Sequence, residues 1–207
     1  TLAHYPKTDT LEYGWSALKI ATQSTAQVIV EASPSNLTTG QPTLDMCFAA
    51  LDAKKHVILA NKGPVAVAYA ELMNKAIANN VFLRFESTVM AGTPSIRLAM
   101  NALRGSNITA LKGILNGTTN YILTQMETGM PYADALAEAQ RLGYAETNPD
   151  GDVLGWDTAG KLSILAAVLF GMQLKLSEMS VQGITEITPQ MIADAQAHGE
   201  RWKLIAE

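Results

Sequence analysis

Four carboxylates and one lysine lie close together in a short part of the sequence. The carboxylates fall within twelve residues, and the lysine follows at the start of an apolar run: Glu146, Asp150, Asp152, Asp157 and Lys161. Asp157 and Lys161 are four residues apart, so a helix would place them on one face. The same order and spacing suit an ordinary surface ion pair, and spacing alone favours that interpretation.

The residues around this cluster favour a more specific role for the lysine. Trp156 precedes it and an apolar run begins at Leu162, which indicates a helix that is buried over much of its surface. A lysine on such a helix must be paired with an acid. Glu146 and Asp152 supply further negative charge nearby. The cluster therefore suits a small substrate with an ammonium group, with Lys161 available for proton transfer.

The first third of the chain alternates patterns typical of strands with patterns typical of helices. Three apolar or β-branched runs are separated by two segments of helical length. This alternation predicts βαβ units and a parallel sheet, with Val28 to Val30 as a buried strand. The expected strands are QVIVEA, HVILA and VFLRFEST, and the expected helices are QPTLDMCFAALDAKK and VAVAYAELMNKAIANN.

Three loops follow the ends of these strands, where parallel sheets bind their ligands. They are EASPSN (31–36), ANKGP (60–64) and ESTVMAGTP (86–94). The last two contain Gly-Pro or Gly-Thr-Pro turns that let the backbone approach a ligand, although ordinary strand-to-helix turns have the same composition. Lys62 favours a ligand site slightly, because it is a charged residue between an apolar strand and a rigid turn.

The second half of the sequence has a more helical character. We expect a helix over TTNYILTQMETG, with Thr118 or Thr119 as its N-cap and Gly129 at its end. A second expected helix, PYADALAEAQRLG, contains an i,i+3 pair of Glu138 and Arg141. The remaining expectations are a long helix from after Asp152 to Gly171, a short strand over SVQGITEI and a helix in GERWKLIAE.

Composition excludes several functional classes. The chain has 207 residues with 48% hydrophobic content, which supports one large domain or two small ones. Its net charge of −4 and its pI near 5.4 argue against nucleic acid as a partner. The longest apolar run is too short for a membrane span. The single cysteine, Cys47, excludes a disulfide framework and favours a reducing, cytoplasmic location.

Motifs for other chemistries are missing from the sequence. There is no G-x-G-x-x-G, P-loop, H-E-x-x-H, C-x-x-C or G-x-S-x-G pattern, and the three histidines are scattered. The first ten residues, TLAHYPKTDT, lack the features of a signal peptide and do not begin with methionine. We therefore expect a fragment of a longer protein, shortened at both ends.

Three longer motifs occur in order along the chain. They are LANKGPVA, ESTVMAGTP and GILNGTTNYIL…GYAETNPDGDVLGWDTAGKLSILA. Taken together, they resemble the homoserine dehydrogenase family, and the likeness extends from about residue 28 to residue 204. The resemblance implies an NAD(P)-dependent oxidoreductase that interconverts L-homoserine and L-aspartate 4-semialdehyde, on the pathway to threonine, methionine and isoleucine. It leaves the choice between NAD and NADP open.

The resemblance also implies roles for particular residues. Lys161 of GWDTAGK matches the lysine that transfers the proton, and Lys62 matches a second lysine near both nicotinamide and substrate. Asp157 and Glu146 match the acids that hold the amino group of the substrate. Further matches are Asp152, Tyr144 and Thr118 in the substrate pocket, Ser33, Lys62 and Gly143 at the cofactor, and Glu86, Val89, Ala91 and Thr93 at a sodium site.

The implied fold class is α/β, with a partial Rossmann-type parallel-sheet domain followed by an α+β substrate and dimerisation domain. Residues 1–88 would form the partial NAD(P)-binding domain. Residues 89–207 would form the substrate domain, incomplete at its C-terminus. The glycine-rich cofactor motif would precede Thr1, and the family pattern implies a homodimer.

Two other functions stay open at this point. One is a different nicotinamide oxidoreductase that acts on another amino acid or semialdehyde, which need not keep both Glu146 and Asp157. The other is a non-catalytic metabolite-binding or assembly module. The presence of both Lys62 and Lys161 disfavours that module.

Overall fold

The structure is a computed structural model that describes residues 14–207. The expectation for TLAHYPKTDT and the first part of the expected domain 1–88 lie outside the described residues. Among the described residues, no helix is both long enough and apolar enough to cross a membrane.

A parallel sheet with adjoining helices forms the first half of the described chain, as predicted. Its elements are α1 (Ala17–Gln23), β1 (Val28–Glu31), α2 (Thr43–Asp52), β2 (His56–Leu59), α3 (Gly63–Ala78) and β3 (Leu83–Arg84). The strands lie in the order β1-β2-β3, with Val28 opposite His56 and Val57 opposite Leu83. Both expected helices connect consecutive parallel strands, which confirms the α/β class.

The described helices cover only one face of this sheet. Ile29, Val57 and Leu59 face α2 and α3 and are at most 7% exposed, whereas Val28 and Val30 are 43% and 67% exposed. Side chains alternate between the two faces along a strand. The prediction that Val28 to Val30 form a buried strand is therefore wrong for both valines, because α2 and α3 pack on the opposite face.

The third strand is shorter than predicted. Within VFLRFEST only Leu83–Arg84 pairs with β2, and Glu86–Thr88 forms a 3₁₀ turn, η2. Thr88 closes this turn, since its backbone N–H and its hydroxyl both donate to the carbonyl of Phe85, at 3.0 and 2.6 Å. A helical segment made of α4 (Ser95–Arg97) and the π-helical η3 (Leu98–Ala102) follows.

Helices are the main regular elements of the second half. They are α5 (Gly117–Met126), α6 (Tyr132–Arg141), α7 (Asp150–Val153), α8 (Trp156–Phe170), the 3₁₀ turn η4 (Leu176–Glu178) and α9 (Pro189–Ala197). As predicted, α6 carries an ion pair between Arg141 and Glu138, at 2.6 Å. The long helix ends at Gly171, also as predicted.

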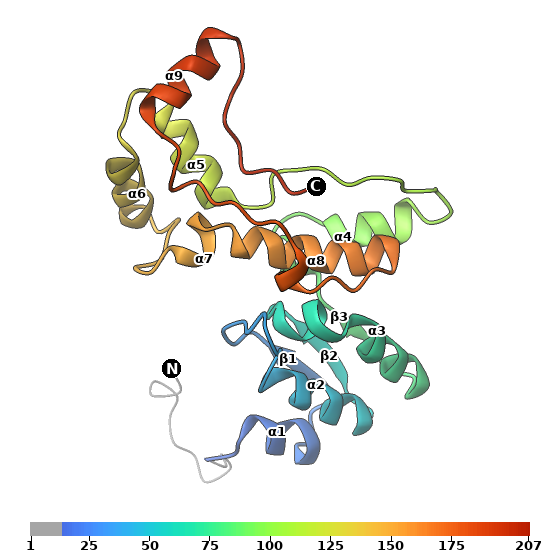
Figure 1. The fold of residues 1–207 in the computed structure, drawn as a ribbon. Helices are drawn as coiled ribbons and strands as arrows, with labels where there is room; N and C mark the ends of the chain where they lie inside the picture. Colours follow the sequence, from blue (N-terminus) through green and yellow to red (C-terminus); the bar gives the residue numbers. More distant parts are fainter. Residues whose placement is uncertain (1–13) are drawn as a thin grey trace.

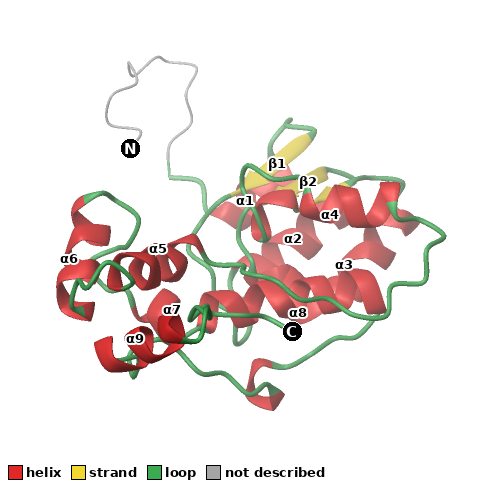
Figure 2. Cartoon of the chain, turned by 90° about the horizontal axis from the view of Figure 1, so that it is seen from above, coloured by secondary structure: helices red, strands yellow, loops and turns green. Residues whose placement is uncertain are grey.

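Helix α8 connects the two parts of the molecule. It packs against α3 and places Ile164 and Leu165 in the same hydrophobic core as the sheet residues. A second core lies among α5, α6 and α9. Figure 1 shows α8 between the sheet with α1 to α3 and the group of α5, α6 and α9. The view from above separates the same two groups (Figure 2).

Two helix boundaries in this half differ from the predictions. Asn116, rather than Thr118 or Thr119, is the N-cap of α5, and its side chain accepts the N–H of Thr119 at 2.8 Å. The helix expected after Asp152 is two helices, because Gly155 adopts a left-handed φ of 89° between α7 and α8. This break turns the chain between two of the predicted site residues.

Two segments predicted to be regular are not. The expected strand at 180–187 has no strand partner among the described residues, and Ile184 donates its N–H to the carbonyl of Val153 at 2.8 Å. The expected helix at 199–207 is extended, with an isolated antiparallel bridge between Gly113 and Ala206. In both segments the backbone pairs with a distant part of the chain, and a local pattern does not reveal such pairing.

Candidate active site

A cavity of about 770 Å³ lies where the loops after β1 and β2 meet the first turns of α5, α7 and α8. This is the carboxyl end of the parallel strands, where sheets of this kind bind ligands. Residues from five separate stretches of the chain line it. Eight of the predicted site residues are among them: Lys62, Thr118, Gly143, Tyr144, Glu146, Asp152, Asp157 and Lys161.

Asp157 is the centre of the charged group in this cavity. Its Oδ2 lies 2.8 Å from Nζ of Lys161, one turn along α8, and its Oδ1 lies 3.2 Å from Nζ of Lys62 at the start of α3. Lys161 also donates to the carbonyl of Leu115 at 2.8 Å. All three charged side chains are at most 22% exposed. The predicted Asp157–Lys161 pair is therefore part of a partly buried cluster rather than a surface ion pair.

The pKa of the Asp157 carboxyl lies below its ordinary value of 3.8. Burial acts in the opposite direction and raises this pKa, because it penalises the charged form. The hydrogen bond and charge of Lys161, the charge of Lys62 and the amide of Asn116 outweigh the effect of burial. Asp157 is therefore a carboxylate at neutral pH and forms an ion pair with each of the two lysines.

Sequence reasoning missed Asn116, which joins two of the predicted acids. Its Nδ2 donates to Oδ1 of Asp152 at 2.6 Å and to Oδ2 of Asp157 at 3.0 Å. Asn116 is 4% exposed, so these bonds form inside the protein. The available signal was the asparagine before Gly117 in GILNGTTNYIL, since asparagine is a preferred N-cap residue. Other lining residues that were missed are Pro34, Ser35, Leu37, Gly117, Asn148, Gly151 and Trp156.

Two acids in the cavity keep free carboxylate oxygens. Oδ2 of Asp152 and both side-chain oxygens of Glu146 accept no hydrogen bond from the residues that the structure describes. The loop that carries Glu146 is held by Gln140, whose amide donates to the backbone carbonyl of Glu146 at 3.0 Å. These two carboxylates are thus available to a cation in the cavity.

Tyr144 and Thr118 form another wall of the cavity. The hydroxyl of Thr118 donates to the carbonyl of Tyr144 at 2.6 Å, which ties the start of α5 to the loop after α6. The ring of Tyr144 lies 4.9 Å from that of Tyr121. Gly143 next to it has φ of 77°, and a side chain there would meet nothing within 4 Å. The backbone at Gly143 therefore faces open space and is accessible to a ligand.

Two glycines determine the angle at which α7 meets α8. Gly155 needs its left-handed conformation, and a side chain there would come within 3.1 Å of Val181. A side chain at Gly183 would collide with the carbonyl of Val153 and come within 2.6 Å of Cα of Leu154. Close packing of the 181–184 segment against this bend orients α7, the helix that carries Asp152.

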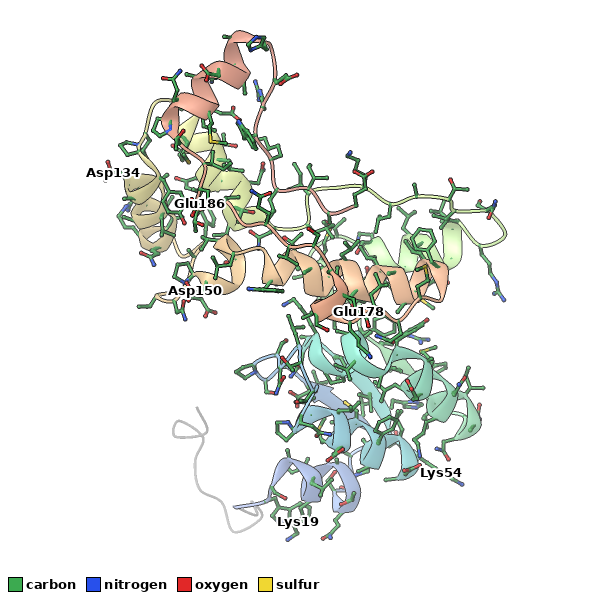
Figure 3. The ribbon with its side chains drawn as sticks, viewed as in Figure 1. Lys19, Lys54, Asp134, Asp150, Glu178 and Glu186 are labelled. Carbon is green, nitrogen blue, oxygen red and sulfur yellow. The ribbon has the colours of Figure 1, made fainter. Side chains whose placement is uncertain are left out.

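Some predicted residues lie elsewhere. Ser33 does not line the cavity, although Pro34 and Ser35 do. Its N–H donates to Oε1 of Glu31 at 2.8 Å, and the amide of Asn61 donates to its hydroxyl at 3.2 Å. Asp150, one of the four clustered acids, is exposed and lies at the start of α7, outside the lining (Figure 3).

The predicted sodium ligands lie together in the loop after β3. The carboxylate of Glu86 accepts the N–H groups of Ile96 and Arg97 at 2.9 and 3.0 Å. Among the described residues, no donor contacts the carbonyls of Val89 and Ala91. In addition, the carbonyl of Thr93 accepts the N–H of Ser95 at 2.8 Å. The loop is therefore folded into a compact turn that leaves two backbone oxygens free.

A larger cavity, of about 1090 Å³, is lined in part by the 35–38 loop. It shares Ser35, Leu37 and Trp156 with the smaller cavity, and the only ionisable side chain in its lining is Lys175. Three of the four clustered acids and both lysines line the smaller cavity. The smaller cavity is therefore the candidate active site.

The chain is similar to known homoserine dehydrogenases. A model of the family "Homoserine dehydrogenase" matches residues 94–207. The NAD(+)-dependent homoserine dehydrogenase of Pseudomonas canavaninivorans is 46% identical over 180 residues, which are 87% of this chain and 51% of that protein. The homoserine dehydrogenase of Methanocaldococcus jannaschii is 44% identical over 193 residues, 93% of this chain and 57% of that protein.

A solved structure agrees with these sequence matches. A hyperthermophilic archaeal homoserine dehydrogenase in complex with NADPH superposes with a TM-score of 0.76 at 35% identity. The match covers 84% of this chain and 53% of that one. The chain thus spans about half the length of the relatives it matches.

Proposed function

The chain belongs to the homoserine dehydrogenase family, and from this premise we propose that the whole protein interconverts L-homoserine and L-aspartate 4-semialdehyde with NAD(P). The observation that carries the proposal is the cluster of Lys62, Asp157 and Lys161 inside a cavity that also presents Glu146 and Asp152. Such a cavity can bind an ammonium group and transfer a proton at an oxygen a few ångströms away.

Lys161 is the proposed proton-transfer residue. Two of its three N–H groups are used by Asp157 and Leu115, so the third is available to a substrate oxygen. In the reduction of the semialdehyde, Nζ of Lys161 gives a proton to the oxygen that becomes the hydroxyl. In the oxidation of homoserine, a neutral Nζ takes that proton back. A bound nicotinamide cofactor supplies the hydride acceptor or donor for the carbinol carbon.

Glu146 and Asp152 are the proposed ligands of the substrate ammonium group. Both have free carboxylate oxygens, while Asp157 already has hydrogen bonds or ion pairs to both of its oxygens. We therefore propose that Asp157 acts mainly by holding the two lysines. Lys62, on the opposite oxygen of Asp157, lies where it can stabilise negative charge on the reacting oxygen. Thr118 and Tyr144 shape the pocket around the substrate.

Some of the residues that line the cavity fit a nicotinamide ring. Ser35 and Pro34 line the cavity at the carboxyl end of β1, and the accessible backbone of Gly143 lies in the same lining. The hydroxyl of Ser35 accepts the N–H of Lys62 at 2.9 Å and keeps its own O–H free to donate. We propose Lys62, Gly143 and the 33–35 loop, including Ser33, as the part of the NAD(P) site that this chain supplies.

We also propose sodium as a ligand of the loop after β3. The proposed ligands are all oxygens, which hard cations prefer, and come from Glu86, Val89, Ala91 and Thr93. The free carbonyls of Val89 and Ala91 support this assignment. Because the carboxylate of Glu86 also holds the start of α4, sodium would act by ordering this loop.

The domain division and the assembly are proposals of the same kind. The family match over residues 94–207 supports a division between 1–88 and 89–207, although α8 packs into the core of the sheet. A homodimer is supported by the extended pair at Gly113 and Ala206, beside which Ile114 and Ile205 are 37% and 42% exposed. We propose that the protein acts in the cytoplasm, in the synthesis of threonine, methionine and isoleucine.

The direct test uses the full-length protein and follows the absorbance of reduced nicotinamide with L-homoserine, with NAD and NADP tested separately. We expect turnover with at least one cofactor. A folded protein that binds the cofactor but leaves homoserine unchanged, while oxidising another amino alcohol, would contradict the proposed substrate.

A further inference from the structure

We propose that Asn116 is a positioning residue, which sets the relative orientation of the Asp152 and Asp157 carboxylates and, through Asp157, that of Lys161. Its kinetic consequences rest on the proposed dehydrogenase function. Asn116 belongs to the segment before α5, whereas the two acids belong to α7 and α8, so a single side chain joins three elements.

The oxygen side of the Asn116 amide begins helix α5. Its Oδ1 accepts the backbone N–H of Thr119 at 2.8 Å and the hydroxyl of Thr119 at 2.9 Å. These bonds satisfy one of the free N–H groups at the start of the helix. The side-chain oxygen is therefore directed into α5.

The nitrogen side of the same amide faces the two acids. Its two N–H groups donate to Asp152 at 2.6 Å and to Asp157 at 3.0 Å. A flipped amide would place its oxygen against two carboxylates and its nitrogen against an N–H group, so the orientation is determined by chemistry. In this orientation the oxygen and both N–H groups of the amide each have a hydrogen-bond partner, and the flipped orientation would lose all of these bonds.

The position of Asp157 in turn affects the lysine. Oδ2 of Asp157 accepts from both Asn116 and Lys161, so the amide and the ammonium group approach the same oxygen. Without the amide, two carboxylates would face each other with no shared donor, and like charges separate when they can. Asp157 would then rotate, and Nζ of Lys161 would move away from the substrate oxygen.

Water is a poor substitute for this amide. Asn116 is 4% exposed and packed between α5 and α7–α8, so a smaller residue leaves the acids to be bridged by a solvent molecule that is not held in position. The charged groups that face Asp157 are Lys62 from α3, Lys161 from α8 and Asp152 from α7, with Glu146 from the loop before α7 in the same cavity.

Two substitutions separate the helix-capping function of Asn116 from its function as a donor. Asn116→Ser keeps an oxygen that can cap α5 but removes both N–H groups, since serine is also a good N-cap residue. Asn116→Asp keeps the cap and the shape but places a third carboxylate against Asp152 and Asp157. The matched control is Thr188→Ala, which removes the side-chain cap of α9, where Thr188 accepts the N–H of Met191 at 3.2 Å.

We expect Asn116→Ser in the full-length protein to lose at least tenfold in kcat, with a melting temperature no lower than that of Thr188→Ala. The acidic limb of its kcat/KM profile should move to higher pH, because the amide of Asn116 contributes to the lowered pKa of Asp157. Asn116→Asp should show the larger shift of the two. Thr188→Ala should lose stability but keep the wild-type kcat and pH profile.

A structure of Asn116→Ser supplies a readout that does not depend on activity. We expect the Asp152 and Asp157 carboxylates to separate relative to wild type. Unchanged carboxylates in that structure, or a kcat within twofold of wild type with an unmoved acidic limb, would overturn the inference. If the wild-type protein does not oxidise homoserine, the proposed function fails, and the crystallographic comparison alone decides whether Asn116 positions the acids.

Discussion

Lys62 and Lys161 lie on opposite oxygens of one carboxylate, that of Asp157, at 3.2 and 2.8 Å. The two lysines come from helices that are almost one hundred positions apart in the sequence, and Asp157 brings both side chains to one wall of the cavity. Two positive charges thus share a single negative partner there. Such an arrangement favours a reacting oxygen that gains negative charge.

Replacement of Lys161 by alanine tests the proton-transfer role. We expect Lys161→Ala to lower kcat by roughly 10² to 10⁴, the usual contribution of a general acid or base, with a small change in KM for homoserine. Steady-state kinetics of the full-length protein measure both values. Lys175→Ala is the control, since Lys175 is 77% exposed and its nearest acid is 3.8 Å away. Equal turnover in Lys161→Ala and wild type would exclude the role.

Replacement of Glu146 tests whether this residue binds the ammonium group of the substrate. Because both of its side-chain oxygens are free, we expect Glu146→Gln to raise KM for homoserine by about tenfold, with little change in kcat. A tenfold change corresponds to a loss of about 1.4 kcal/mol in binding free energy. 4-Hydroxybutanoate, which lacks the amino group, should inhibit wild type and variant equally. If the variant instead loses affinity for both compounds, Glu146 shapes the pocket and does not bind the ammonium group. Glu178→Gln on the exposed η4 turn is the control.

The lowered pKa of Asp157 predicts a pH dependence of stability. A carboxyl whose pKa is lower in the folded state contributes stability that is complete above its unfolded pKa, near 3.8, and disappears as pH falls through the folded value. Asp157→Asn should therefore be less stable than wild type at pH 7, by on the order of 2 kcal/mol. The difference should shrink as pH drops below about 4.

Urea unfolding of the full-length protein at pH 7 and at lower pH values measures this difference. Asp134→Asn is the control, because Asp134 is exposed, lies on α6 (Figure 3) and is not among the residues that line the cavity. A gap between Asp157→Asn and wild type that stays constant with pH would contradict the assignment of the lowered pKa to the ion pairs with the lysines.

The close packing around Gly183 predicts that a single added methyl group there greatly lowers stability. In Gly183→Ala the new side chain would collide with the backbone of α7, which cannot move without displacing Asp152. We expect a loss of about 2–4 kcal/mol in the free energy of unfolding. Gly151→Ala is the matched control, since nothing lies within 4 Å of that position and it is inside a helix. Equal stability of the two variants would show that the 181–184 segment does not support the bend.

The burial of Cys47 predicts that its thiol is modified slowly in the folded protein. Burial, with a smaller contribution from the charge of Glu31, raises the pKa of its thiol to about 12. The residue is also 0% exposed, so neither access nor a thiolate is available in the folded state. Iodoacetamide should label Cys47 only at the rate of unfolding, with fast labelling in denaturant as the control. Fast labelling of the native protein would contradict the packing of α2 against the sheet.

The sequence by itself determined the local elements and the list of chemical groups. β-branched runs between helical segments predicted the parallel sheet, and the motifs with Lys62, Glu146, Asp157 and Lys161 predicted a charged site and its family. These features depend on side-chain type and short-range periodicity, which a sequence states directly. The predicted helices were confirmed where the local pattern and the tertiary contacts agreed, as in α2, α3 and α8.

Only the tertiary structure decided which of these groups meet. The segment 180–187 has the composition of a strand but packs as a loop on α7, and Asn116 resembles a simple N-cap residue but holds two acids from other helices. The pairing of Lys62 with Asp157 likewise joins residues almost one hundred positions apart. The reason is physical: partners for buried polar groups are set by packing in three dimensions, and no period in the sequence encodes that packing.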